Sequence, residues 1–187
     1  MVLSLARIYY PVKTLGPGNR VGIWVNGCQR RCPGCISPEL WEYDAGREIE
    51  ITKITEWIKA IKEPKDGFTV SGGEPFDQPD GLCELVKELS LINDDSLIFT
   101  GYTIEELKSM KDSRIDYIIR NCAAMVDGPY VDELNDDKGL RGSSNQRVIL
   151  NRYHEKYAGS EILERKIQIV KHDTSFYMFG IPGRNKK

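Results

Sequence analysis

Several features that assign a protein to a class at a glance are missing from this 187-residue sequence. No stretch approaches the ~18 consecutive apolar residues of a membrane span, and the opening "MVLSLARIYYP" is too short and too interrupted by charge for a signal peptide. The formal net charge is −2, without a basic excess, which disfavours nucleic acid as a partner. We therefore expect a cytoplasmic protein that binds neither membrane nor nucleic acid.

Cysteine is scarce too: the chain has five, an odd number, and only two histidines. In a reducing compartment, this count argues against a framework of disulfides. Three of the five lie in "NGCQRRCPGC" (26–35), where the C-x3-C-x2-C spacing lets one loop turn Cys28, Cys32 and Cys35 inward. The sequence therefore predicts a metal or catalytic site in this loop.

The loop provides no fourth ligand. A structural zinc site takes four ligands, usually from two pairs, and an iron–sulfur cube is normally held by four thiolates. Cys83 and Cys122 fall in apolar segments, where we expect them in the core, and His154 and His172 have no partner in the sequence. The pattern favours a cluster with one open iron, because catalytic metals keep an open position. A zinc site or a set of reduced thiols remains the alternative.

Apolar strands alternate with amphipathic segments along the chain. Strands are expected at 20–26, 67–70, 96–100, 123–129 and 146–150, with extended segments at 166–170 and 176–182. Apolar residues at helical spacing predict helices that contain Ile51, Ile54, Ile58 and Ile61, and Leu82, Leu85, Val86 and Leu89. Thr103 and Glu106 form a capping box for a third helix.

Alternation of strands with helices indicates βαβ units and a parallel sheet. A full eight-unit barrel needs roughly 250 residues, more than this chain has. We expect one α/β domain over residues 1–187, a partial, open-sided barrel of five or six βα units. Residues 1–20 would lead into the first strand, and a C-terminal extension would begin near residue 151.

Polar and glycine-rich segments follow the predicted strands. "SGGEP" (71–75), "TGYT" (100–103) and "VDGP" (126–129) each come at a strand end, as does the cysteine loop. Ligands of parallel α/β folds bind at the carboxyl ends of the strands. An isolated "SGGEP" would be no more than a strand-to-helix turn. Beside three cysteines, bare glycine backbone and the Glu74 carboxylate would suit a ligand with an ammonium group.

Together these segments resemble the radical S-adenosylmethionine superfamily. "CQRRCPGC" matches its C-x3-C-x2-C motif and "GGEP" its adenosylmethionine-binding motif. Within the superfamily, the chain resembles the activating proteins of anaerobic (class III) ribonucleotide reductase. That narrower resemblance lies in "GPGNR" (16–20), "CPGCISPELWE" (32–42), "TGYT", "VDGPYVDEL" (126–134), "RGSSNQRVI" (141–149) and "GIPG" (180–183).

The resemblance implies a cofactor and a reaction. A [4Fe-4S] cluster on Cys28, Cys32 and Cys35 would leave one iron for the amino and carboxylate groups of S-adenosylmethionine. Reductive cleavage of that cosubstrate would give methionine and a 5′-deoxyadenosyl radical, which would abstract a glycine Cα hydrogen from a partner glycyl-radical enzyme, anaerobic ribonucleotide reductase. An electron donor such as flavodoxin or ferredoxin would reduce the cluster.

The resemblance also implies which residues form the site. Gly72, Gly73 and Glu74 would hold the methionine end of S-adenosylmethionine, and Thr100, Gly101 and Tyr102 would lie near its ribose or adenine. Asp127 would bind ligand hydroxyls or the methionine end, unless it only forms a turn. Arg141, Ser143, Asn145 and Gln146 would line the site or order its lid, unless they only form a polar surface loop.

Two other functions remain open from the sequence. A small radical S-adenosylmethionine enzyme that acts on a metabolite or a peptide would share the core chemistry. A metal-binding module without catalytic activity would need the cysteines but not Glu74. Binding of S-adenosylmethionine separates this second alternative from both enzymes.

Overall fold

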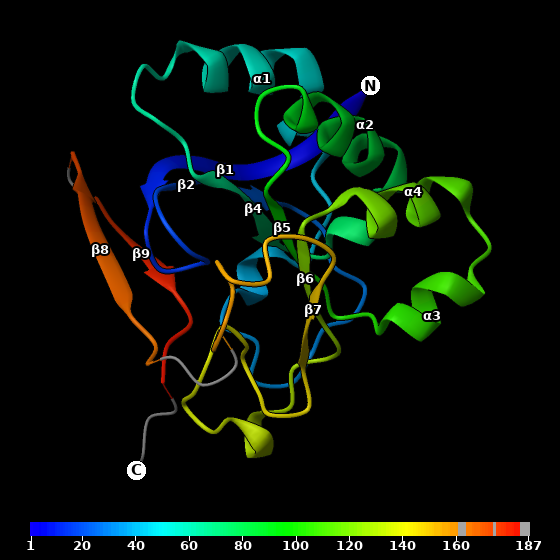
Figure 1. The fold of residues 1–187 in the computed structure, drawn as a ribbon, viewed down its shortest axis with the longest axis vertical. Coiled ribbons are helices and arrows are strands. Elements are labelled where there is room, and N and C mark those ends of the chain that lie inside the picture. Colours follow the sequence, from blue (N-terminus) through cyan, green and yellow to red (C-terminus); the bar gives the residue numbers. More distant parts are fainter. Residues whose placement is uncertain (161–163, 174, 184–187) are drawn as a thin grey trace.

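The computed structural model describes residues 1–160, 164–173 and 175–183. Its main sheet has seven strands in the order β3-β1-β2-β4-β5-β6-β7 (Figure 1). Their bounds are β1 Val2–Val12, β2 Arg20–Val25, β3 Glu48–Glu50, β4 Gly67–Gly72, β5 Ser96–Phe99, β6 Ala124–Asp127 and β7 Arg147–Leu150. Strands β2, β4, β5 and β6 are parallel to one another. The molecule is thus a mixed α/β protein with a parallel centre, and five of its strands were predicted.

Helices cover one face of this sheet. They are α1 Ile51–Ala60, α2 Pro79–Ser90, α3 Ile104–Ser109 and α4 Ser113–Asn121 (Figure 1). The predicted apolar positions of the first two are buried, apart from Ile61, which is partly buried after α1 ends. Thr103 and Glu106 form the predicted capping box of α3. Helix α4 was not predicted.

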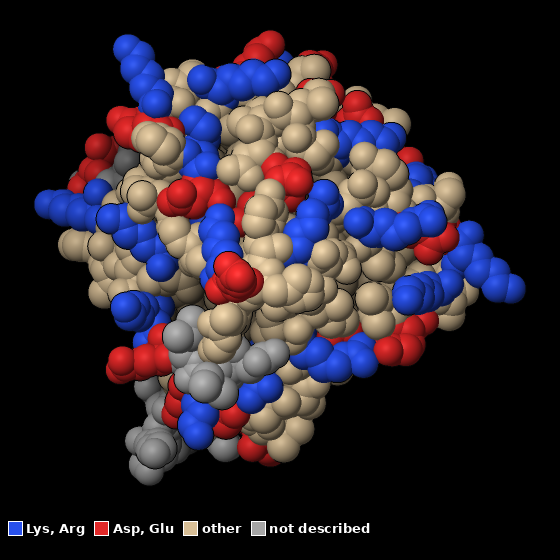
Figure 2. All heavy atoms as spheres, viewed as in Figure 1, with Lys and Arg blue, Asp and Glu red and all other residues tan. Residues whose placement is uncertain are grey.

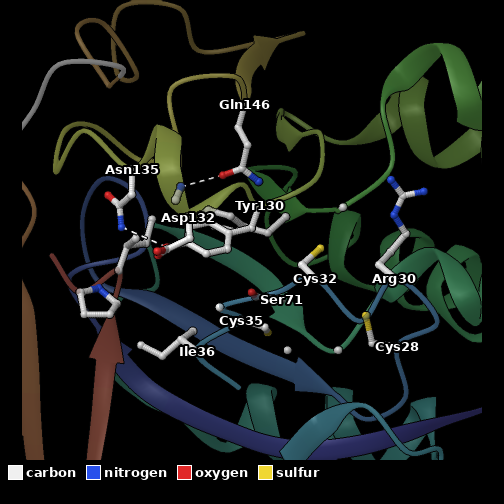
Figure 3. Close-up of a pocket in the computed structure, with 18 of the residues that line it drawn as sticks. Cys28, Arg30, Cys32, Cys35, Ile36, Ser71, Tyr130, Asp132, Asn135 and Gln146 are labelled. Carbon is white, nitrogen blue, oxygen red and sulfur yellow. Dashed lines mark hydrogen bonds between the residues drawn. The ribbon is translucent and has the colours of Figure 1, made fainter. Parts of the chain in front are cut away.

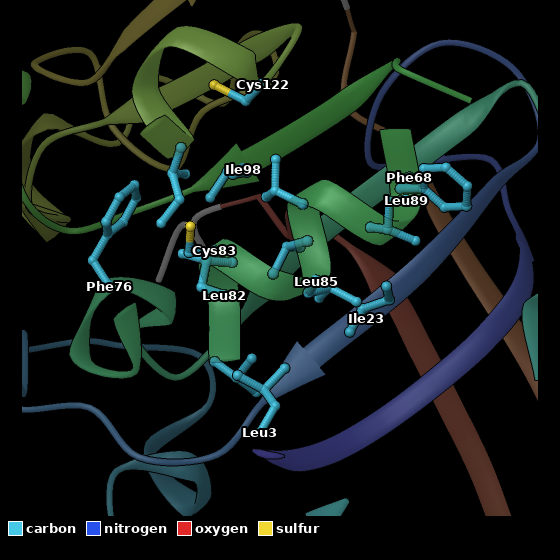
Figure 4. Packing of buried hydrophobic residues seen from close by; sticks show 14 of the residues in the cluster. Leu3, Ile23, Phe68, Phe76, Leu82, Cys83, Leu85, Leu89, Ile98 and Cys122 are labelled. Atoms are coloured by element: carbon cyan, nitrogen blue, oxygen red, sulfur yellow. The ribbon is translucent and has the colours of Figure 1, made fainter. Parts of the chain in front are cut away.

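The strand side chains divide between the two faces with the period of two that strands impose. Ile23, Val70 and Ile98 lie in the large apolar cluster beneath the helices, which also takes up Cys83 and Cys122 (Figure 4). Leu97, next to Ile98, and Val126, next to Met125 of the large cluster, lie in a second, smaller cluster. Both faces of the parallel strands are therefore covered, as in other α/β folds.

One expectation about strand direction needs correction, and one segment contains a strand that was not predicted. Residues 1–20, expected only to lead into the first strand, contain β1, which pairs antiparallel with β2. The predicted fifth strand, β7, pairs antiparallel with β6. Its connection, residues 128–146, contains only the short 3-10 turn Asp132–Leu134, and a parallel strand requires a longer crossover, usually a helix. The parallel part of the described sheet therefore has four strands rather than five or six.

The C-terminal extension forms a separate hairpin of β8 Ile167–His172 and β9 Ser175–Gly180. Both extended segments were predicted; the mixed stretch before them, near 154–165, lies partly outside the described residues. The Phe179 ring of β9 stacks on Tyr9 and Trp24, with ring centroids 4.7 and 5.0 Å apart. The hairpin therefore packs on the sheet face opposite the helices.

Among the described helices, none is long and apolar enough to cross a membrane. Lysines and arginines alternate with aspartates and glutamates over the face in Figure 2, without a large area of one sign.

Candidate active site

The carboxyl ends of the parallel strands open into a cavity of about 1370 Å³. Loops after β2, β4 and β5 line it, together with residues from 130–146 and from the C-terminal segment 178–183 (Figure 3). Nine predicted site residues line this cavity: Cys28, Cys32, Cys35, Gly72, Gly73, Glu74, Thr100, Gly101 and Gln146. Three strand ends that were predicted to form one site therefore do meet.

The cysteine loop is held to the segment that follows it. Gly27 N–H donates to the Leu40 carbonyl and Cys28 N–H to the Trp41 carbonyl, both at 2.8 Å. Gly34 has a φ of +77°, a left-handed conformation that glycine adopts without strain. Between the second and third cysteines, this turn returns the chain toward the cavity.

The three cysteines of the loop are half-buried free thiols that face the cavity. Burial raises the pKa of the Cys28 thiol. The described residues include no group of three His, Cys, Asp or Glu side chains arranged around a single metal ion. In an iron–sulfur cube each thiolate binds a different iron. The three thiols of this loop therefore suit a cluster whose fourth iron has no ligand from the loop.

The glycine–acid turn is bonded directly to the cysteine loop. Gly73 N–H donates to the Val25 carbonyl and Glu74 N–H to the Gly27 carbonyl, both at 2.8 Å. A Cβ on Gly73 would lie 2.1 Å from the Gly27 carbonyl oxygen, far inside van der Waals contact. Only glycine allows the two segments to approach so closely. The turn and the cysteine loop therefore form one structural unit.

Glu74 lies at the centre of this unit, with its carboxyl group buried in the protein. The carboxylate accepts hydrogen bonds from Thr100 Oγ1 at 2.8 Å, Gly101 N at 2.7 Å and Phe76 N at 3.0 Å. Burial raises the pKa of Glu74 to about 7, against the lowering effect of these donors. A carboxylate offers about four acceptor positions. One is therefore left for a donor in the cavity, such as a ligand ammonium group.

Two residues expected at the site do not line the cavity. The Tyr102 hydroxyl donates to Asp77 Oδ1 at 2.9 Å, and its ring packs against the apolar core. The buried Asp127 carboxylate accepts from Ile104 N at 2.8 Å, at the start of α3, and pairs with Arg147. In this arrangement both side chains support α3 and its flanking loop rather than face a ligand.

Of the four residues predicted in the polar loop, one lines the cavity and three do not. Gln146 lines the cavity, where its Oε1 accepts from Gly142 N at 2.7 Å. Ser143 Oγ accepts from Val131 N, Asn145 donates to the Pro129 carbonyl and Arg141 pairs with Asp136. These three side chains stabilise loop 128–146 through contacts within the loop. A loop-ordering role agrees with this placement, and direct contact with a ligand would fall to Gln146.

Several residues that line the cavity were not among the predicted site residues. Arg30 lines the cavity, lies 4.7 Å above the Tyr102 ring and pairs with Glu106 at 3.1 Å. Ser71, Phe99 and residues 130–142 lie in or beside quoted motifs, but their spacing carries no signal for a cavity wall. The wall at 181–183 falls in the "GIPG" block, and only that resemblance pointed to it.

Comparison with known proteins matches residues 14–149 to the family described as a 4Fe-4S single cluster domain. The anaerobic ribonucleoside-triphosphate reductase-activating protein of Escherichia coli K12 is 31% identical over 150 residues, 75% of this chain and 94% of that protein. The protein of the same name from Enterobacteria phage T4 is 29% identical over 155 residues, covering 80% and 95%. The pyruvate formate-lyase-activating enzyme of Clostridium pasteurianum is 33% identical over 76 residues, 38% of this chain and 32% of that enzyme.

Proposed function

Since the chain belongs to the 4Fe-4S single cluster domain family, with the activating proteins of anaerobic ribonucleoside-triphosphate reductase among its relatives, we propose that it activates such a reductase. It is a glycyl-radical-enzyme activase that carries a [4Fe-4S] cluster. Its cosubstrate is S-adenosylmethionine, its partner is an anaerobic ribonucleotide reductase, and its electron comes from a donor such as flavodoxin or ferredoxin. The reaction takes place in the cytoplasm, where the thiols stay reduced.

One observation carries this proposal: the three-cysteine loop and the glycine–acid turn are bonded to each other at the edge of one cavity. The bond from Glu74 N to the Gly27 carbonyl is 2.8 Å long. An open iron and a buried carboxylate would then face the same space. A metal-binding module without catalytic activity would not require the Glu74 carboxylate beside the cysteine loop.

Different residues bind the cluster and the cosubstrate. Cys28, Cys32 and Cys35 hold the cluster, and the absence of a fourth thiolate in the loop leaves one iron for the cosubstrate. Glu74 and the backbone of Gly72 and Gly73 bind the amino end of S-adenosylmethionine. When bound, the reduced cluster would supply one electron that cleaves S-adenosylmethionine to methionine and a 5′-deoxyadenosyl radical, and this radical would remove a hydrogen atom from glycine.

Other parts of the cavity position the rest of the ligand. The Thr100–Gly101 turn, with Phe99, offers a polar and an apolar contact for the ribose and adenine. The parallel strands β2, β4, β5 and β6 support the proposal of a partial, open-sided radical S-adenosylmethionine barrel in one domain, residues 1–187. An open side admits a loop from a folded protein, which is how a glycine of the reductase would reach the site.

The test has two stages, both anaerobic. The protein is first reconstituted with iron and sulfide and reduced, and its electron paramagnetic resonance spectrum is recorded with and without S-adenosylmethionine. A [4Fe-4S]⁺ signal that changes on addition, with release of 5′-deoxyadenosine, is the expected result; a spectrum indifferent to the cosubstrate would refute the enzyme. Cognate reductase is then added, and a glycyl radical must appear on it. Cleavage without that radical would instead favour a metabolite or peptide substrate.

A further inference from the structure

The hairpin β8–β9 lies outside residues 14–149, which match the family of 4Fe-4S single cluster domains. The family match ends at residue 149 and the hairpin begins at Ile167. Met178 of β9 nevertheless lines the cavity, as do Ile181, Pro182 and Gly183, which directly follow the hairpin. The C-terminal extension therefore forms part of the opening of the site.

The inner face of the hairpin is fixed to the sheet. Phe179 is buried against Tyr9 and Trp24. Gln168 Nε2 donates to the Pro11 carbonyl at 2.8 Å, and its Oε1 accepts from Lys13 N at 2.9 Å. The hairpin is thus a platform with a defined orientation.

A second attachment holds the extension to the cavity wall. The Arg165 side chain, only 6% exposed, donates to Asn135 Oδ1 at 2.7 Å, to the Gly142 carbonyl at 3.1 Å and to the Pro182 carbonyl at 3.2 Å. All three acceptor residues line the cavity. Arg165 therefore fixes the hairpin and the wall relative to each other.

The outer face of the hairpin carries large apolar side chains in solvent. Ile169 is 68% exposed, Phe176 69% and Met178 50%. Ile169 pairs directly with Met178 across the two strands, and Phe176 lies two residues before Met178 on the same face. Single exposed apolar residues are ordinary, but a contiguous group on a fixed surface indicates an interaction site.

This outer face is continuous with the opening of the cavity through Met178, which belongs to both. Ile36, one residue after Cys35, is a second exposed apolar side chain on the cavity lining. In Figure 3 it lies on the side of the cavity nearest to β9, with Cys28 and Arg30 at the opposite end. A small substrate would need only the cavity. The apolar surface continues from the rim of the cavity onto the hairpin. This arrangement suits a protein substrate, of which one segment enters the cavity while the rest of the folded protein lies against the hairpin.

We propose that the outer face of the hairpin, Ile169, Phe176 and Met178, is the docking surface for the glycyl-radical protein that this chain activates. An apolar surface next to the partner's glycine-bearing segment covers these three side chains, and the segment passes Met178 and Ile36 into the cavity. This inference rests on the proposed function and adds the place where the partner binds.

The test uses the reconstituted holoenzyme and cognate reductase. In the double variant Ile169→Asp/Phe176→Asp, docking would bury two unpaired carboxylates against apolar surface. We expect the KM for the reductase, and its Kd by direct binding, to rise about tenfold or more, in the range of an interface hot spot. The kcat at saturating reductase and the cleavage of S-adenosylmethionine without reductase stay unchanged, because neither residue lines the cavity.

Two further variants serve as controls. Ile169→Thr/Phe176→Thr keeps strand propensity and should weaken binding in the same direction but by less. Leu91→Asp places the same charge on an exposed apolar residue that follows α2 and does not line the cavity; it should bind reductase like the wild type.

The proposal is overturned if the Asp double variant binds reductase as tightly as Leu91→Asp does. It is equally overturned if the wild type is a dimer that the double variant dissociates while the KM for reductase stays the same, since the surface would then cover a second copy of this chain. A wild type that cleaves S-adenosylmethionine but forms no glycyl radical would refute the proposed function instead. The two failures are distinguishable, because loss of the glycyl radical would be seen in the wild-type protein, without any substitution in the hairpin.

Discussion

The raised pKa of Glu74 predicts a particular dependence of stability on pH. In the unfolded chain the carboxyl has its ordinary pKa of 4.5, whereas burial raises the pKa to about 7 in the folded protein. Between these values the folded state holds a proton that the unfolded state has lost. The stabilisation associated with Glu74 is thus fully present below pH 4.5 and is lost as the pH rises through 7.

The magnitude follows from the difference between the two pKa values. Each pKa unit corresponds to about 1.4 kcal/mol, so a rise from 4.5 to about 7 amounts to about 3 kcal/mol of unfolding free energy. The side chain is 1% exposed, so solvent screening removes little of it. This is a large fraction of the 5–15 kcal/mol that stabilises a typical domain.

Comparison with Glu74→Gln isolates the effect. The amide does not titrate, and its mismatch with the donors Thr100 Oγ1 and Gly101 N adds a cost that does not vary with pH. Carboxylates with lowered pKa values, such as Asp95, impose the opposite trend at acidic pH. They do so equally in both proteins and cancel in the difference.

The assay is urea unfolding monitored by tryptophan fluorescence. It uses cluster-free protein with reduced thiols, because release of the metal on unfolding would add its own dependence on pH. From pH 4 to pH 8 the stability of the wild type relative to Glu74→Gln should fall by about 3 kcal/mol. A difference that stays flat would show that the three donors outweigh burial and that Glu74 ionises like an exposed carboxyl. The reasoning about its environment would then be wrong.

Three further outcomes are expected. Cys32→Ser should abolish iron and sulfide incorporation under anaerobic reconstitution, whereas Cys83→Ser, in the apolar core, should retain both; retention by the first would remove the loop as the cluster site. Gly73→Ala should reduce cluster content and S-adenosylmethionine affinity at least about tenfold, because its methyl group meets backbone, whereas Gly46→Ala, whose Cβ meets only the Asp44 side chain, should resemble wild type in both assays. Phe179→Ala should weaken reductase binding while leaving cleavage of S-adenosylmethionine intact, since the hairpin loses its buried anchor; unchanged binding would separate the hairpin from docking.

Local sequence patterns were sufficient to predict most helices and strands and the two motifs at the centre of the site. The helix with Ile51, Ile54 and Ile58 repeats its apolar residues at helical spacing, and the capping box at Thr103 is a contact between near neighbours. The cysteine loop and "SGGEP" were identifiable because each motif is contiguous. Their meeting followed from a general property of parallel strands, whose carboxyl ends lie at one edge.

Contacts between distant segments could not be predicted in this way. Arg165 reaches Asn135 and Gly142 across more than twenty residues, and nothing in its neighbourhood distinguishes it from an exposed arginine. Phe179 stacks on Tyr9 from the other end of the chain. The segment 176–182 was expected to be extended, but its local sequence could not identify the surface that Phe179 would meet.

The partners of Asp127 depend on the direction of β7. Asp127 was expected at a strand end, either to bind a ligand or to form a turn, and β7 was expected to continue the parallel series. Because β7 runs antiparallel to β6, Arg147 stands directly opposite Asp127 in the register, and its guanidinium Nε lies 2.9 Å from the carboxylate. The same carboxylate accepts from Ile104 N at the start of α3, where an acid is favoured. Once the strand is reversed, the acid already has a cation and a helix terminus as partners, and a role in binding a cosubstrate is no longer needed to explain a buried carboxylate.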